Sequence, residues 1–441
     1  MKFTTALSLL LFAALAQGAA AATAQVTTYN HIRLIDGTGA AARNDMAIAV
    51  KGDRIVAITP AVKSGNGVVD MKGAVAMPGM INTHVHLATW PNLPYAEAIQ
   101  RRNLYAGITA VRDMAGDTRE LAYLKRAIEI GEAPGSDLYF ASLMAGPEFF
   151  HDPRTVQSTA GYDHVPGQVT WMRAITPQTD MPLAIAEAKG TGATAIKIYA
   201  DLPAPLVGRI TAEAHRQNLL VWAHAAVFPA SPMQVADSGV DVMSHVCMLG
   251  YQASAQMPRT YHNRAAVDAK KLNDPHAIDA LLSDMKTRGT IMDATLYVYQ
   301  VLDKMKNVNP PPYCTLAIAS KLLGETYRAG VPISAGTDAE TDWHDPLPAL
   351  PDELALLVKA GMTPMDAIRS ATAIAARTIG QQRDMGTLEP GKLANVAFLA
   401  KDPLADIANV KTVTLTVKRG KPYPRRDFKP ITAAEGKYAD D

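Results

Sequence analysis

Two histidines separated by one residue give the sharpest chemical signal in the chain. His84 and His86 stand on either side of Val85, at the end of an apolar run that begins at Met80. Side chains alternate between the two faces of a β-strand, so both imidazoles point to the same side if this run is a strand. Neutral imidazole is a common ligand of divalent transition metals. The pair therefore predicts half of a metal site, although a polar strand end can produce the same short pattern.

Three further candidate ligands follow other apolar runs. His224 comes directly after 219–223, His245 after 240–244, and Asp338 shortly after 331–336. The active-site groups of α/β barrels gather at the C-terminal ends of the strands. One histidine in such a position is more often a hydrogen-bonded structural residue, but three candidates in register with the histidine pair favour a shared site. We therefore predict a metal site formed by these five residues: His84, His86, His224, His245 and Asp338.

Lys197 lies inside the apolar run 195–199, where a charged amine would be costly to bury. An unpaired ammonium there would cost several kcal/mol, or its pKa would fall until the amine is neutral. One interpretation is a lysine that reaches the barrel end or pairs with a carboxylate. The other is a neutral amine that reacts with CO₂ to form a carbamate, which bridges two metal ions through its oxygens. We predict the second arrangement, with Lys197 carboxylated between two divalent ions.

The elements that would position these residues alternate regularly between residues 81 and 380. Eight short apolar strands are expected at 80–84, 108–113, 137–141, 194–200, 219–223, 240–245, 290–294 and 331–336. Amphipathic helices are expected at 119–130, 205–217, 278–288 and 315–329. This alternation predicts an α/β fold of the (β/α)₈ TIM-barrel type. An open doubly wound sheet is the alternative, but no glycine-rich phosphate motif follows any of the strands.

Two other parts of the chain have distinct patterns. Both ends are rich in short apolar runs separated by turn residues, and neither end can bury a core alone. We therefore predict one small domain of β structure that combines residues 25–80 and 381–430 and adjoins a barrel of residues 81–380. The segment 146–179, with its proline, glycine, histidine and aromatic residues, is expected to be a long loop after the third barrel strand. Loops of that length are usually functional or mobile.

Composition excludes several classes of partner and site. The 441 residues include 43 basic and 42 acidic side chains, so no broad basic surface is expected and nucleic acid is not an expected partner. Cys247 and Cys314 are the two cysteines, too few for a disulfide scaffold or a cysteine-based zinc cluster. Because Cys247 is in phase with His245, it is expected to face inward as a small apolar filler.

The first 24 residues have the pattern of a secretory signal peptide. Lys2 precedes an apolar run at 6–16, and Ala22-Thr23-Ala24 fits the small-residue rule for cleavage. The apolar run is too short to cross a membrane. We therefore expect cleavage after Ala24, a secreted or periplasmic protein, and no membrane association once residues 1–24 are removed.

Taken together, these residues resemble the amidohydrolase superfamily of metal-dependent hydrolases. The run 77–86, the ligands in the order given, and the closing segment 386–395 carry the resemblance, which is nearest to the imidazolonepropionase-like and Xaa-Pro-dipeptidase-like branch. The resemblance implies a distorted barrel with a composite β-sandwich and two divalent ions, most commonly zinc. It also implies hydrolysis of a carbon–nitrogen bond.

The resemblance also implies how the ligands divide and what Asp338 does. One ion would be held by His84, His86 and Asp338, the other by His224 and His245, with carboxylated Lys197 as the bridge. A hydroxide between the ions would attack a carbonyl, and Asp338 would act as general base and then as general acid toward the leaving nitrogen.

The substrate is less well defined by the sequence. An amide such as a dipeptide or an N-acyl amino acid is favoured. Hydrolysis of a lactone or ester at the same site, and a catalytically silent barrel that binds a partner, both stay open, as does assembly into a homo-oligomer. An arginine, Arg173 or Arg259, is expected to hold a substrate carboxylate. The candidate substrate contacts are Tyr199, His151, Arg173, His164, Trp171 and Arg259.

Overall fold

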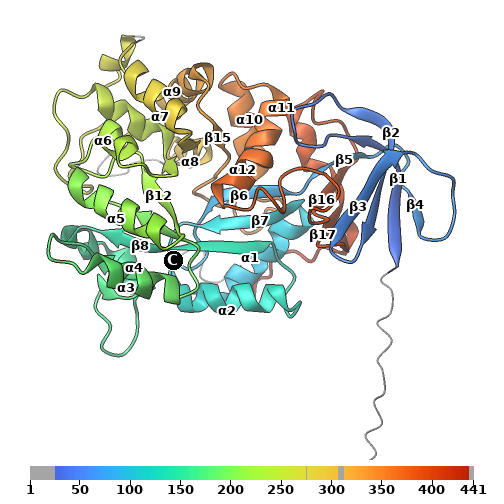
Figure 1. Cartoon of the computed structure of the whole chain (residues 1–441), viewed down its shortest axis with the longest axis horizontal. Coiled ribbons are helices and arrows are strands. Elements are labelled where there is room, and N and C mark those ends of the chain that lie inside the picture. The colour runs from blue at the N-terminus through green and yellow to red at the C-terminus, as the bar shows by residue number, and fades with distance from the viewer. Residues whose placement is uncertain (1–24, 275, 306–311, 437–441) are drawn as a thin grey trace, which may run out of the picture.

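The computed structural model describes residues 25–274, 276–305 and 312–436 (Figure 1). The predicted signal peptide, residues 1–24, lies outside the described residues. Within the described residues, every helix is too short or too polar to cross a membrane.

The larger part of the chain forms the predicted barrel. Parallel pairing runs through neighbouring strands in chain order, and all eight predicted strands are confirmed to within a few residues. The distorted (β/α)₈ barrel expected from the sequence is therefore the observed architecture. Its strands are β6 (Met80–Val85), β7 (Ile108–Asp113), β8 (Asp137–Ala145), β11 (Ala195–Ile198), β12 (Leu220–His224), β13 (Val242–Ser244), β14 (Ile291–Asp293) and β15 (Ile333–Ser334).

The first and last barrel strands meet through a few contacts rather than a regular ladder. The amide of Thr83 donates to the carbonyl of Ala335 at 3.0 Å, and the amide of Asp338 donates to the carbonyl of His84 at 3.0 Å. The side chain of Asn82 adds a bond to Thr337 Oγ1 at 2.9 Å. These contacts nearly close the barrel, and they place two predicted metal ligands on either side of the same seam.

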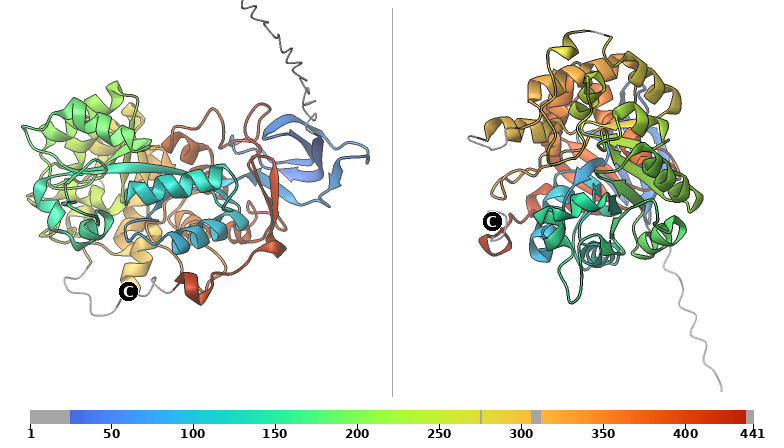
Figure 2. Two further views of the ribbon diagram at one scale, coloured as in Figure 1. Left: turned by 90° about the horizontal axis from the view of Figure 1, so that it is seen from below. Right: turned by 90° about the vertical axis from the view of Figure 1, so that its left-hand side faces the viewer.

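Helices cover the outside of the barrel (Figure 2). Helix α9 begins after Thr315, whose hydroxyl accepts from the amide of Ile318, and ends at Gly330, which has a positive φ of 81°. The four predicted helices are confirmed as α2 (Thr118–Glu129), α5 (Ala204–Arg216), α7 (Asp279–Arg288) and α9 (Leu316–Ala329). The others are α1 (Leu93–Tyr105), α4 (Met181–Gly190), α6 (Pro232–Asp237), α8 (Leu296–Lys304), α10 (Leu350–Lys359), α11 (Pro364–Ser370), α12 (Ala373–Thr378) and the short α13 (Ala433–Gly436).

Strands from both chain ends form a second, mixed sheet beside the barrel (Figure 1). Strand β5 pairs antiparallel with β16, and the rings of Tyr29 and Phe398 pack together in its core. This sheet corresponds to the predicted composite β domain; the limits 25–80 and 381–430 stay a prediction. Its strands are β1 (Val26–Leu34), β2 (Arg43–Lys51), β3 (Arg54–Pro60), β4 (Val68–Asp70), β5 (Val75–Pro78), β16 (Val396–Leu399), β17 (Val413–Lys418) and β18 (Lys421–Pro424).

The segment 146–179 is more ordered than the predicted loop. It contains a 3-10 helix (Pro147–His151), helix α3 (Pro153–Ser158) and two short strands, β9 (Gln168–Val169) and β10 (Met172–Ala174). Strand β10 adds in parallel to β8. The expectation of a plain loop was wrong because short elements of two to six residues lack a readable periodicity.

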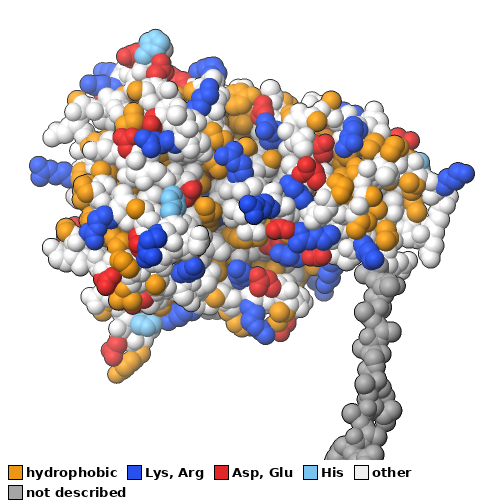
Figure 3. Space-filling view, viewed as in Figure 1, with side chains coloured by type: hydrophobic (Ala, Val, Ile, Leu, Met, Phe, Trp, Pro, Cys, Tyr) orange, Lys and Arg blue, Asp and Glu red, His pale blue; other side chains and the backbone are white. Residues whose placement is uncertain are grey.

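The space-filling view shows basic and acidic side chains intermixed on one face of the molecule (Figure 3). This agrees with the nearly equal numbers of the two charge types in the whole chain.

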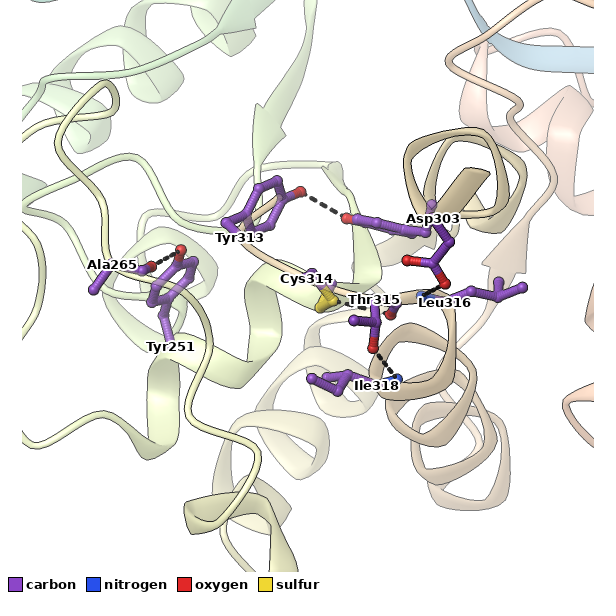
Figure 4. Close-up of a disulfide and its surroundings, with 10 residues drawn as sticks. Tyr251, Ala265, Asp303, Tyr313, Cys314, Thr315, Leu316 and Ile318 are labelled. Atoms are coloured by element: carbon purple, nitrogen blue, oxygen red, sulfur yellow. Dashed lines mark hydrogen bonds between the residues drawn. A yellow bond between two sulfur atoms is a disulfide. The ribbon is translucent and has the colours of Figure 1, made fainter. Parts of the chain in front are cut away.

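The two cysteines form a disulfide between the 3-10 helix Val246–Ala253 and the residue before Thr315 (Figure 4). The expectation that Cys247 is an unpaired apolar filler was therefore wrong. Its inward position was expected correctly, since Cys247 is fully buried. Its partner Cys314 is 67 residues away, and no local pattern connects the two.

Replacing both cysteines with alanine is expected to lower the free energy of unfolding by about 2–4 kcal/mol, because the crosslink restricts a long loop in the unfolded chain. Urea denaturation of the two proteins under oxidising conditions measures the difference. A reducing agent should destabilise the wild type and leave the double variant unchanged. Equal midpoints for both oxidised proteins would show that the disulfide does not contribute.

Candidate metal centre and active site

The structure brings the five predicted histidine and aspartate ligands together at the C-terminal ends of the barrel strands. One ring nitrogen each of His84 and His245 and a carboxylate oxygen of Asp338 lie within 4.8 Å of one another. His86 Nε2 is 3.0 Å from Asp338 Oδ1. The His224 ring centroid is 4.7 Å from that of His245. Strands β6, β12, β13 and β15 therefore supply these groups to one place, as the strand-end pattern predicted.

Lys197 lies in β11 and is fully buried. Its Nζ has no hydrogen-bond partner among the described residues. Burial lowers its pKa to about 7, and Arg112 acts in the same direction, while Asp293 and Asp338 oppose the shift. The amine is thus held where its neutral, nucleophilic form is accessible near neutral pH.

Burial and neighbouring charges also shift the pKa values of other candidate ligands. Burial is the largest cause that lowers the pKa of His224, and Lys197 and His245 lower it further. Burial also lowers the pKa of His245. For Asp338, burial would raise the pKa, but His84 and His245 outweigh it and hold the pKa well below the usual range. His224 and His245 are therefore neutral beside an ionised Asp338. At His84, burial would lower the pKa, but the carboxylates of Asp338 and Asp293 outweigh it and raise the pKa.

The backbone at two of these residues adopts an uncommon conformation. His245 has a φ of 72° and Asp338 a φ of 52°, both in the left-handed region. Such residues cost about 1–3 kcal/mol each and persist where the surroundings impose them, often at functional sites. Here the amide of His245 donates to the carbonyl of Asp293 at 3.0 Å, and the amide of Asp338 is held by His84.

Asp293, at the end of β14, is a central residue that the sequence analysis missed. Its carboxylate is fully buried and lies 2.6 Å from His84 Nδ1 and 2.8 Å from Arg112 Nη2, from which it accepts a bond. Hydroxyls of Thr83 and Ser244 donate to it at 2.8 and 2.9 Å. The contact of Nδ1 with Asp293 leaves Nε2 of His84 directed toward the other candidate ligands, 3.2 Å from Asp338 Oδ1. A metal-binding histidine usually has such a carboxylate on its second ring nitrogen. Its position at the end of a predicted strand could have identified it.

The donor set fits divalent metal ions. Imidazole nitrogens and carboxylate oxygens are ligands that zinc, manganese, iron and cobalt accept. In addition, two buried polar atoms at this place, Nζ of Lys197 and Nδ1 of His224, lack a hydrogen-bond partner among the described residues. A buried polar group normally has a partner, so these two atoms are consistent with a site completed by a further group.

A cavity of about 420 Å³ opens above these residues. Tyr199, a predicted substrate contact, lines it, and its ring lies 4.1 Å from that of His224 between centroids. Most of the polar and aromatic lining was not predicted from the sequence, because it comes from loops and short helices that follow the barrel strands and have no readable pattern. These missed residues are Phe149, Arg154, Tyr261, Arg264, Tyr299 and Tyr313.

The other predicted substrate contacts are not among the residues that line this cavity. His151 is exposed and lies near Glu148, and Arg173 forms an ion pair with Glu187 at 2.9 Å. His164 and Arg259 are exposed, and Trp171 is buried, with Nε1 donating to the carbonyl of Ser158. Charge and residue type alone did not distinguish these residues from the ones that face the cavity.

Comparison with known proteins supports the family resemblance. Residues 284–423 match the model of the amidohydrolase family, a range that includes Asp293, Asp338 and the closing strands of the mixed sheet. This match covers less than half of the chain and supports the resemblance to the amidohydrolase superfamily. Among curated proteins, ochratoxinase from Aspergillus niger is similar to this chain, 39% identical over 101 residues, which are 21% of this chain and 20% of the relative. The match thus spans about a fifth of that protein's length.

Solved structures share the fold over almost the whole chain. A Xaa-Pro dipeptidase with bound methionine superposes with a TM-score of 0.72 at 21% identity, covering 91% of this chain and 100% of the other. The A. niger ochratoxinase structure superposes with a TM-score of 0.72 at 22% sequence identity, covering 91% of this chain and 96% of the other. Molinate hydrolase superposes with a TM-score of 0.71 at 19% identity, covering 92% of this chain and 97% of the other.

Proposed function

We propose that this protein is a metal-dependent hydrolase that cleaves an amide C–N bond of a small substrate such as a dipeptide or an N-acyl amino acid. The observation that carries the proposal is a set of candidate metal ligands, three of which, His86, His245 and Asp338, line one cavity, beside a buried lysine amine without a hydrogen-bond partner among the described residues. The match of residues 284–423 to the amidohydrolase family model supports it. The names of structural neighbours, Xaa-Pro dipeptidase and ochratoxinase, favour a substrate with an amide bond.

In this proposal, His84, His86 and Asp338 hold one ion and His224 and His245 hold the other. Lys197 would also hold the ions, after its neutral Nζ attacks CO₂, forms an N–C bond and loses a proton to give a carbamate anion. Divalent ions held by these residues, expected to be zinc, would lower the pKa of water and polarise a carbonyl oxygen.

The chain's own residues would then manage the proton and the substrate. The Asp338 carboxylate takes the proton of the attacking water and returns it to the departing nitrogen, because an amine leaves poorly without that proton. Asp293 keeps the His84 ring oriented throughout. The ring of Tyr199 and the other aromatic residues exclude water from one side of the cavity. We also propose that the mature protein acts outside the cytoplasm, after cleavage at Ala24.

Elemental analysis and a substrate panel test this function. The purified full chain should contain about two divalent ions per molecule, and chelation should abolish turnover. Zinc-loaded protein is assayed with dipeptides, N-acyl amino acids and lactones. Release of amines from the first two classes supports the proposal. Turnover of lactones alone would favour the ester reaction, and a stable protein without metal or turnover would favour the silent binding barrel.

A further inference from the structure

Two arginines enter the cavity above the metal ligands, and each lies near tyrosine rings. The guanidinium carbon of Arg154 is 5.9 Å from the Tyr199 ring centroid. That of Arg264 is 4.0 Å from the Tyr261 centroid and 4.5 Å from the Tyr313 centroid. Both side chains are lining residues of the cavity. They differ in whether a carboxylate of the protein already pairs with the guanidinium, and this decides which of them can bind an anion.

The charge of Arg154 is already neutralised. Its Nε donates to Asp152 Oδ1 at 3.0 Å and its Nη2 donates to Asp152 Oδ2 at 2.7 Å, a two-point pair with a largely buried carboxylate. The fork of donors that could bind a substrate carboxylate is therefore occupied. The remaining Nη1 lies 3.4 Å from the hydroxyl of Tyr199.

Arg264 has no ion pair with any carboxylate in the described part of the chain. Its Nη1 donates to the carbonyl of Tyr261, and its Nε is buried without a hydrogen-bond partner. Asp201 is close enough for Arg264 to influence its pKa, but Asp201 Oδ1 accepts from the amide of Tyr261 instead, at 2.7 Å. A cation with unused donors thus faces a cavity whose walls are mostly aromatic and aliphatic.

The guanidinium of Arg264 is also held in place. One of its two stacking rings, Tyr313, donates to or accepts from the hydroxyl of Tyr299 at 2.7 Å and directly precedes the disulfide-bonded Cys314 (Figure 4). The other, Tyr261, packs against Tyr199 and His224 with ring centroids 5.6 and 5.7 Å apart. A planar donor group fixed between two rings loses little conformational freedom when it binds a carboxylate.

The rest of the cavity wall suits a large apolar group. Trp90, at its mouth, is 55% exposed, and the remaining apolar lining includes Leu143, Phe149, Met172, Met248, Val298 and Leu302. Such a wall favours aromatic and long aliphatic groups by removing their surface from water.

We propose that Arg264 binds the free carboxylate of the substrate, and that the substrate is an N-acylated amino acid, or a dipeptide, with a large apolar side chain. This rests on the proposed amide hydrolysis and names the substrate class of the same site. It assigns carboxylate binding to Arg264 in place of Arg173 or Arg259, which are not among the residues that line the cavity.

The kinetic test compares N-acetyl-L-phenylalanine with its carboxamide on the zinc-loaded full chain, by release of acetate. A charge-assisted bond contributes about 1.5–3 kcal/mol, so the wild type should prefer the acid by about 10- to 100-fold in kcat/KM. Arg264→Met should reduce kcat/KM for the acid to about the value for the carboxamide in the same variant, so that the preference for the acid is lost. Arg264→Lys keeps the charge without the fork and should be intermediate. Arg259→Met, at an exposed position near Arg264 in the sequence, is the control and should match the wild type.

A binding test separates this inference from the hydrolytic function. Calorimetry with 3-phenylpropanoate and 3-phenylpropanamide needs no turnover, and the wild type should bind the acid more tightly by a similar factor that Arg264→Met removes. Equal binding of acid and amide by the wild type, or an unchanged preference in Arg264→Met with an unchanged melting temperature, would overturn the assignment to Arg264. Tighter binding of the acid that depends on Arg264, in a protein that hydrolyses no amide in the panel, would support the assignment to Arg264 and contradict only the proposed function.

Discussion

Replacement of Asp338 by asparagine is expected to reduce kcat by about 10²- to 10⁴-fold, the usual contribution of a general acid–base group. The carboxylate lies 3.0 Å from His86 and 3.2 Å from His84, so it is placed among the other predicted ligands. Asparagine retains one oxygen that can act as a ligand, but it cannot take a proton from water and pass it to the departing amine. Some metal should therefore remain while most turnover is lost. Steady-state kinetics and elemental analysis of the same preparation measure both quantities.

Asp342→Asn is the matched control for this variant. Asp342 lies four residues further along the chain, is exposed, and pairs with His344 at 2.7 Å, so the same chemical change there should leave kcat and metal content unaltered. An Asp338→Asn protein with normal metal content and unchanged kcat would remove Asp338 from the proton-transfer role. Loss of all metal in that protein would show that the main role of Asp338 is to hold metal rather than to transfer a proton.

The barrel and the clustering of the candidate ligands were predictable because their signals are local. Each strand is a short apolar run, and the residue type directly after it, as with His224 and His245, identifies the groups at the barrel mouth. Lys197 could be identified as a candidate functional residue because an ionisable side chain is unfavourable in the middle of a buried strand. These inferences need only the period of a strand and the position of a residue within it.

The features that were missed depend on contacts between distant parts of the chain. Asp293 acts through His84, 209 residues earlier, and the disulfide joins residues 67 apart. The difference between Arg154 and Arg264 is set by whether a carboxylate lies beside the guanidinium, since Asp152 pairs with the first. Neither periodicity nor composition carries that information, because loops between barrel elements obtain their positions from packing rather than from a repeating pattern.

Replacement of Lys197 by methionine is expected to lower the metal content from about two ions per chain to about one or fewer and to abolish most turnover, because the variant cannot form the bridging carbamate. In the metal-free protein, by contrast, the same substitution should increase stability. The amine is fully buried without a hydrogen-bond partner, so an apolar side chain of similar length should raise the free energy of unfolding of chelator-treated protein by about 1–3 kcal/mol. Elemental analysis, kinetics and urea denaturation of wild type and variant measure the three effects.

The opposite signs of these effects separate a metal-binding role of Lys197 from a structural one. A lysine that stabilises the barrel would give a less stable apoprotein when removed, whereas a lysine kept for metal binding gives a more stable one that cannot be loaded. Lys189→Met, on α4, is the control, because Lys189 Nζ donates to the carbonyl of Gln217 at an exposed position and should affect neither metal content nor turnover. Intact-mass analysis of gently handled wild type should show the added mass of one CO₂, absent from Lys197→Met. A Lys197→Met protein that still binds two ions and turns over substrate would exclude the carbamate bridge.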